Sequence, residues 1–296
     1  MKKLFNAQGY LLIGHIVAMA FGLAGIILVL PNTDFMTKLT SFEWGQRIFA
    51  WSMAGGGVAY MLLGAAAIAI YAYRTLGLWH CLGFAIPAVG LSLTSELLGT
   101  STGFPFGHYR YLSGLGYKIA GLVPFTIPLS WFYLGFSAYI IALVGLQTIE
   151  IKNWLRYLGA IAFGALCLTS WDFVLDPAMS QAPIPFWVWE QPGAFFGMPY
   201  QNFAGWMGTG MVFMTVATLL WRMKPLEITS LDLTLPLAIY LANFTFATVL
   251  SLAAGFYIPI LLGVILGIAP VTILYWMSTN NKLDNSILSL QVKLTR

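Results

Sequence analysis

The sequence predicts an all-α protein that crosses a membrane several times, and three observations support this prediction. Of the 296 residues, 59% are apolar and only 8% are charged, whereas a soluble domain usually carries about 25% charged residues. Several apolar stretches reach about 20 residues, the length that a helix needs to cross a hydrocarbon core about 30 Å thick. Backbone groups find no water partners inside lipid, so these stretches are expected to be helices. Residues 1–282 are therefore expected to form one polytopic transmembrane helical bundle.

Eight apolar segments have the length of a membrane span. They cover residues 8–30, 47–73, 78–98, 119–148, 154–172, 201–221, 233–253 and 256–277. Lys2 and Lys3 precede the first, but its apolar run is longer than the core of a signal peptide, about 7–15 residues, so it is interpreted as a retained span. Pro124 and Pro128 predict a kink or an irregular start for the fourth. In the tail, 283–296, apolar residues recur at helical spacing, which indicates either a short interfacial helix or a loosely ordered segment.

The charged residues between the spans predict the orientation in the membrane. With eight spans, ten Lys and Arg residues lie on the side of the N-terminus and four lie on the opposite side. Because positive charge marks the cytoplasmic side, both termini are expected to be cytoplasmic. The acidic residues lean toward the outer side, where the two longest connections, 99–118 and 173–200, are expected to lie.

Several common functional motifs are missing from the sequence. It contains no Gly-rich phosphate loop and no HExxH, GxSxG or DDxxD motif, which disfavours phosphate-ester substrates and metal-dependent chemistry. Cys81 and Cys167 both fall in apolar segments, so neither a disulfide nor a thiolate metal site is expected. His15, His80 and His108 are not clustered, and His15 is interpreted as a core histidine satisfied by hydrogen bonds. The basic residues are scattered over short connections, so nucleic acid is not an expected partner.

Glu96 closes the third span at the outer edge of the predicted bundle, where an acidic side chain is costly to bury. In the connection that follows, Gly99, Gly103 and Gly107 let the backbone turn sharply and come close to a bulky group. The alternative interpretation is a glycine-rich surface turn, with Glu96 reaching into the lipid headgroups.

Asp172 and Asp176 lie four residues apart at the end of the fifth span. In a helix this spacing puts both carboxylates on one face, although Pro177 favours an end of the helix before Asp176. Two close carboxylates in a poorly solvated place do not both ionise easily, so a neutral acid would lie beside a charged one. General acid–base catalysis uses such a pair. The alternative is a structural ion pair between Asp172 and Arg110 or Lys118.

Aromatic residues surround these acids throughout 170–206. Trp and Tyr at a membrane interface usually anchor the protein there, and this is the default interpretation for most of them. The functional alternative is an apolar slot whose ring faces stabilise a cation. Asn202, at the start of the sixth span, is placed to hold a water molecule or a carboxylate.

Several further motifs occur in one order between residues 96 and 210. They read Glu96-x2-Gly99-x2-Thr102-Gly103-x-Pro105-Phe106-Gly107-x-Tyr109-x-Tyr111, Gly121-x-Val123-Pro124, Pro128-Leu129-x-Trp131, Asp172-x3-Asp176-Pro177, Trp187-x-Trp189 and Gly197-x-Pro199-x2-Asn202-Phe203-x-Gly205-Trp206. In this order they resemble the carotenoid 1′,2′-hydratase (CruF) family, to which the bisanhydrobacterioruberin hydratases belong. The flanking spans share only the general apolar character of that family.

The resemblance implies an enzyme that adds water to the terminal 1′,2′ double bond of an acyclic carotenoid end, as in lycopene or γ-carotene, and gives a tertiary alcohol. It implies no cofactor and, as partners, an acyclic or monocyclic carotenoid and membrane lipid. A separate carotenoid glycosyltransferase would act on the product. The expected location is a prokaryotic cytoplasmic or photosynthetic membrane. A carboxylic acid would protonate the alkene, and water would capture the tertiary cation.

For this reaction the candidate catalytic residues are Asp172 or Asp176 as the proton donor, with the other, or Glu96, as the base toward water. The candidate substrate-binding residues are Asn202, Trp171, Trp187, Trp189, Phe106, His108, Tyr109, Arg110, Trp131 and Trp206. Two other functions stay open. A small proton-coupled transporter would spread ionisable residues through the depth of the spans, and a non-catalytic lipid- or pigment-binding protein would tolerate Asp172→Asn.

Overall fold

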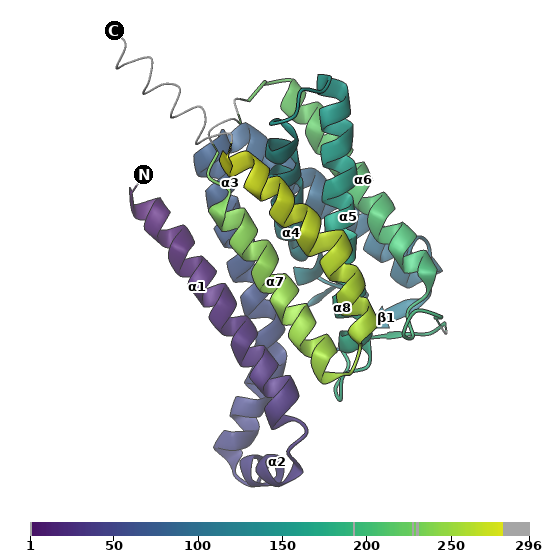
Figure 1. Cartoon of the computed structure of the whole chain (residues 1–296). Helices are drawn as coiled ribbons and strands as arrows, with labels where there is room; N and C mark the ends of the chain where they lie inside the picture. The colour runs from purple at the N-terminus through teal and green to yellow at the C-terminus, as the bar shows by residue number, and fades with distance from the viewer. Residues whose placement is uncertain (1, 192, 227, 229–230, 281–296) are drawn as a thin grey trace.

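The computed structural model of the protein describes residues 2–191, 193–226, 228 and 231–280, and within them it is a bundle of long helices (Figure 1). In chain order the elements are α1 (Lys2–Ala24), η1 (Gly25–Val29), α2 (Thr33–Thr40), α3 (Glu43–Thr102), β1 (Tyr109–Tyr111), β2 (Lys118–Ile119), β3 (Val123–Pro124), α4 (Thr126–Leu146), α5 (Asn153–Ser180), β4 (Trp187–Trp189), α6 (Tyr200–Arg222), α7 (Thr234–Ala253), α8 (Tyr257–Gly263) and η2 (Val264–Ile268). The predicted all-α membrane bundle is confirmed. The predicted tail, 283–296, lies outside the described residues.

The third helix contains two of the predicted spans. Among the described residues, seven helices are long and apolar enough to cross a membrane, and one of these, Gly55–Thr102, is 48 residues long. At about 1.5 Å per residue its two halves together are long enough for two crossings of a hydrocarbon core. Gly77 interrupts it with φ +83° and ψ 170°, a conformation that glycine adopts without steric cost. Counting the two halves separately gives the eight predicted spans, with the break in the predicted interval between 73 and 78.

The two ends of the described chain lie at the same end of the bundle. The last helix runs from Tyr257 to Asn280. In Figure 1, the start of α1 and the end of this last helix both lie at the end of the bundle that is opposite to α2 and β1. An even number of spans requires this arrangement. The cytoplasmic location of this end stays a prediction from the distribution of positive charge.

Two predicted helix boundaries were wrong, both beside the two longest connections. The fourth span begins at Thr126 rather than at 119, because 118–124 fold into the small antiparallel pair of β2 and β3; the predicted irregular start is confirmed. The fifth span does not end at 172 before Pro177 but continues to Ser180. Val174, Leu175, Ala178 and Met179 are buried there, so packing outweighs the local preference of the proline.

A buried histidine ties the first helix to the bundle. His15 is fully buried, its Nδ1 lies 2.7 Å from the carbonyl oxygen of Tyr60, and its Nε2 lies 2.9 Å from Nδ2 of Asn243. Both ring nitrogens therefore have partners in neighbouring helices. The interpretation of His15 as a satisfied core histidine is confirmed.

The last helix packs against α5 through two glycines that are four residues apart. A Cβ added at Gly263 would lie 2.3 Å from Cγ2 of Val174, and one added at Gly267 would lie 2.1 Å from Oγ of Ser170. Small residues at this spacing let membrane helices approach closely. This contact supports α5 at Ser170 and Val174, on either side of Asp172 in the chain.

We expect Gly267→Ala to destabilise the protein by about 1–3 kcal/mol, because the added methyl group overpacks this contact. Thermal unfolding of the purified protein in detergent measures the effect as a lower midpoint. Gly208→Ala is the matched control, since a Cβ added there meets nothing within 4 Å. Equal midpoints for the two variants would contradict the close contact between α5 and the last helix.

Candidate active site

The two longest connections, 99–118 and 173–200, meet in a short two-stranded ribbon of β1 and β4. The strands are antiparallel, with Arg110 opposite Val188. Side chains alternate between the faces of a strand, and directly opposed residues share a face. Arg110 is exposed, so it marks the outer face. The other face therefore carries four aromatic side chains, in the opposed pairs Tyr109–Trp189 and Tyr111–Trp187, and we call these two strands the aromatic ribbon.

Glycines in the preceding connection allow the ribbon to fold back onto the helices. Gly103 ends α3 with φ +81°. Gly107 has φ +107°, and a Cβ there would lie 2.9 Å from Cγ of Pro199, whereas a Cβ on Gly99 would lie 2.7 Å from Cδ2 of Phe106. The predicted sharp turns and close approaches are confirmed.

Glu96 lies beneath the aromatic ribbon and is only 2% exposed. One carboxylate oxygen, Oε2, accepts hydrogen bonds from the hydroxyls of Tyr109 and Tyr111, the second at 2.9 Å. The other, Oε1, accepts from Nε1 of Trp131 at 3.0 Å. Because the carboxylate is enclosed by three donors, its interpretation as a headgroup contact on a surface turn was wrong.

The two tyrosines of β1 are reliable donors to Glu96. Burial, and after it the neighbouring charge of Glu96, raise the pKa of the Tyr109 and Tyr111 hydroxyls well above its ordinary value. Both hydroxyls therefore stay protonated at physiological pH. They hold one oxygen of Glu96 in place from the side of the aromatic ribbon.

Asp172 and Asp176 share one face of α5, and each is 3% exposed. Oδ1 of Asp176 accepts hydrogen bonds from the indole nitrogens of Trp187, at 3.1 Å, and Trp189, at 2.9 Å. Oδ2 of Asp172 accepts from Nδ2 of Asn202 at 2.7 Å. The same amide nitrogen lies 3.5 Å from Oδ2 of Asp176, so Asn202 bridges the two carboxyl groups.

The structure does not support a structural ion pair for Asp172. Arg110 pairs instead with Glu190, with Nε 3.1 Å from Oε1, and both side chains are more than half exposed. Nζ of Lys118 donates to the carbonyl oxygen of Tyr111 at 2.6 Å. Among the residues that the structure describes, no Lys, Arg or His pairs with Glu96, Asp172 or Asp176.

All three acids line one small cavity of about 50 Å³, which we call the acid cavity. Trp131 lies behind it, stacked on Trp206 with ring centroids 3.9 Å apart. His108 and Arg110 do not line it: both are exposed, and the alternation of β1 turns Arg110 outward, so a role for them in substrate binding stays a prediction apart from this cavity. The other predicted binding residues in its lining are Phe106, Tyr109, Trp171, Trp187, Trp189, Asn202 and Trp206.

Sequence reasoning missed part of the acid cavity. Tyr111 donates to Glu96. Tyr109 and Tyr111 are two residues apart, a spacing that puts both side chains on one face of a strand, and this pattern could have identified Tyr111 as a site residue. Tyr60, Leu115 and Met179 also line the cavity. They come from separate parts of the chain, and no local pattern marks them.

The acid cavity combines hydrogen-bond acceptors with room for water. Indole nitrogens only donate, so Oδ1 of Asp176 and Oε1 of Glu96 are fixed as acceptors. A space of about 50 Å³ holds roughly three or four water molecules. The described residues contain no group of three His, Cys, Asp or Glu that could hold a metal ion. The arrangement is suited to moving protons between carboxyl groups and water beside aromatic rings.

The fold and the acid cavity define a polytopic membrane protein with carboxyl groups buried under aromatic side chains. Residues 56–270 match the model of a family described as carotenoid biosynthesis protein, and the chain belongs to this family. Over 131 residues the chain is 38% identical to the bisanhydrobacterioruberin hydratase of Haloarcula japonica. The matched segment covers 44% of this chain and 42% of that relative, so the chain spans less than half the length of the curated relative it matches. No solved structure matches.

Proposed function

We propose that the protein is a carotenoid hydratase, which adds water to the terminal 1′,2′ double bond of an acyclic carotenoid end and gives a tertiary alcohol. The observation that carries this proposal is the convergence of three buried carboxyl groups, an amide and several aromatic rings in one small cavity. Membership in a carotenoid biosynthesis family supports the substrate class. The name of the Haloarcula relative supports hydration as the reaction.

Asp172 is the proton donor in this mechanism. Its carboxyl group receives one close hydrogen bond, from Asn202, whereas Asp176 receives two from indoles and Glu96 receives three. Hydrogen-bond donors favour the charged form of a carboxylate, so Asp172, which receives the fewest, is the carboxyl group that carries a proton. The π electrons of the alkene take this proton at the less substituted carbon. The positive charge then lies on the carbon that carries two methyl groups.

Aromatic rings and Glu96 complete the reaction. The faces of Trp171 and Trp206, whose ring centroids are 6.0 Å apart, stabilise the tertiary cation. A lone pair of a cavity water forms the new C–O bond, and Glu96 accepts the proton that this water loses. Transfer of that proton through water from Glu96 to Asp172 restores the starting state. The net change is the addition of one water molecule to the alkene.

Expression of the full chain in cells that make lycopene or γ-carotene tests the proposal. We expect pigments that are heavier by one water molecule, detected by liquid chromatography and mass spectrometry, because the site adds water without oxidation. Cells that carry Asp172→Asn at the same protein level are the control. Folded protein with no such product would contradict the proposal, and an unchanged carotenoid that co-purifies with it would favour the pigment-binding alternative.

A further inference from the structure

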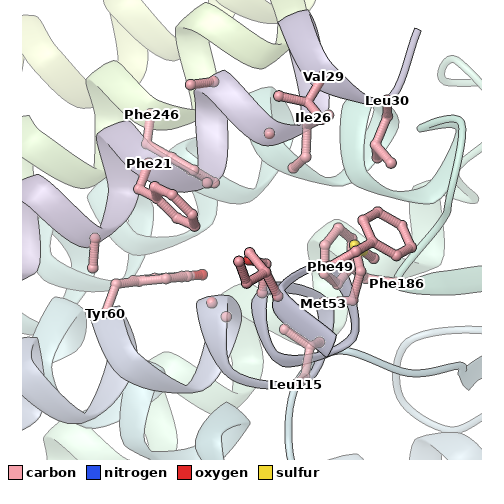
Figure 2. A pocket seen from close by; sticks show the side chains of 18 of the residues that line it. Phe21, Ile26, Val29, Leu30, Phe49, Met53, Tyr60, Leu115, Phe186 and Phe246 are labelled. Atoms are coloured by element: carbon pink, nitrogen blue, oxygen red, sulfur yellow. The ribbon is translucent and has the colours of Figure 1, made fainter. Parts of the chain in front are cut away.

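A second and larger cavity, of about 300 Å³, adjoins the acid cavity. Residues of α1, η1, α2 and the first half of α3 line it. Figure 2 shows Phe21 of α1 and Ile26 of η1 on one side of the space and Phe49 and Tyr60 of α3 on the other. Tyr60, Leu115 and Met179 line both cavities and form the wall between them. We propose that this second cavity holds the conjugated hydrocarbon chain of the substrate next to its reacting end. The inference rests on the proposed function and extends it to the path of the substrate.

The lining suits a hydrocarbon and no polar ligand. Among the described residues that line the second cavity, none is Asp, Glu, Lys, Arg or His, and only Ser52 and Tyr60 have polar side chains. Phe21, Phe49 and Phe186 surround the space, and Tyr60 points its hydroxyl into it (Figure 2). Burial of an unpaired polar group in such a lining would be costly, whereas a polyene gains by the contact.

Glycines on two facing helices leave this space empty. Gly25 of η1 and Gly56 of α3 line the cavity, yet a Cβ added at either residue meets nothing within 4 Å. Glycines in membrane helices commonly let two backbones touch, as Gly57 does, where a Cβ would lie 2.6 Å from the carbonyl oxygen of Gly114. Empty apolar space destabilises a protein, so the room at Gly25 and Gly56 is consistent with an occupant. The π-helical turn η1 at this point fits the same role, because such turns occur frequently at functional sites.

The sizes of the two cavities favour the same path. The acid cavity has room for a few water molecules but not for a branched hydrocarbon end as well. The larger cavity reaches the lower end of the range for small-molecule sites, about 300–1,000 Å³. At its rim Phe21, Phe35 and Ile48 are 60%, 47% and 51% exposed. The hydrocarbon therefore enters from the lipid past α1, and its end displaces the wall side chains to reach the acids.

The test compares two neighbouring glycines of α3. Gly56→Phe places a ring in the larger cavity without a backbone clash, because the space beside it is open. Gly55→Phe is the matched control: it has equal open space and does not line either cavity. Each change is made in the full-length protein and, separately, together with Asp172→Asn to trap substrate. Lycopene turnover in membranes and carotenoid retained per purified protein, from its visible absorption, are the readouts.

We expect Gly56→Phe to lower turnover and retained carotenoid at least tenfold relative to Gly55→Phe, with equal amounts of folded protein. Turnover and retention equal in the two variants would overturn the inference and leave the proposed function standing. Loss of a bound phospholipid in Gly56→Phe, with carotenoid turnover unchanged, would also overturn it, since the occupant would then be a lipid acyl chain. If no variant hydrates lycopene, the proposed function fails, and carotenoid retention alone decides the inference.

Discussion

Asp172→Asn is expected to slow carotenoid hydration by about 10²–10⁴-fold, the contribution of a positioned general acid. The carbonyl oxygen of the new side chain can still accept the hydrogen bond that Nδ2 of Asn202 now donates over 2.7 Å, so the local structure is preserved. The N–H groups of an amide are far too weakly acidic to protonate an alkene, and the tertiary cation therefore does not form. The measurement is the initial rate of conversion of lycopene by membranes with a known amount of the protein.

Two further variants make this expectation specific. Glu190→Gln removes an exposed acid whose pair with Arg110 lies at the surface, and such pairs contribute at most about 1 kcal/mol, so its hydration rate should match the unmodified protein. Asp176→Asn keeps a carbonyl oxygen that can accept from the two indole donors, but it removes the charge and the acid–base function of this carboxyl group. A normal rate in Asp172→Asn together with a lost rate in Asp176→Asn would make Asp176 the proton donor instead.

The spans were predictable because hydrocarbon thickness sets the length of an apolar helix. The break at Gly77 was predictable for the same reason, since the 48 residues of Gly55–Thr102 exceed one crossing. The end of α5 was not predictable from local preference. Pro177 favours an earlier end of the helix. The turns around it are instead stabilised by packing against residues that are distant in the sequence, and a local pattern does not indicate such packing.

The site was predictable where chemistry is concentrated in the sequence. Asp172, Asp176 and their tryptophans lie close together in the chain, and acids beside a membrane are rare enough to indicate a function. The contribution of Tyr111 and the outward direction of Arg110 depend on the pairing of β1 with β4, two strands about 80 residues apart. The larger cavity could not be predicted from the sequence, because apolar residues that line an empty space are of the same types as those that pack in a core.

Glu96→Gln is expected to slow hydration by about 10²–10⁴-fold as well, but at a different step, because it removes the base toward water. The new side chain fits the existing partners. Its carbonyl oxygen can accept from Nε1 of Trp131, which now lies 3.0 Å from Oε1. Its NH₂ group can donate to the hydroxyls of Tyr109 and Tyr111, since hydroxyls accept as well as donate. The protein should therefore fold normally and still protonate the alkene.

Reaction in D₂O separates the two roles. In Glu96→Gln, Asp172 adds a deuteron to the alkene, water capture is slow, and the cation returns a proton to the Asp172 carboxylate. The recovered carotenoid should therefore contain deuterium. In Asp172→Asn no cation forms, so the recovered carotenoid should be unlabelled, while Glu190→Gln should give an alcohol with one new C–D bond. Carbon acquires deuterium only where the proton donor is intact. Deuterium in the carotenoid recovered from Asp172→Asn, with none in that from Glu96→Gln, would therefore make Glu96 the acid and Asp172 the base.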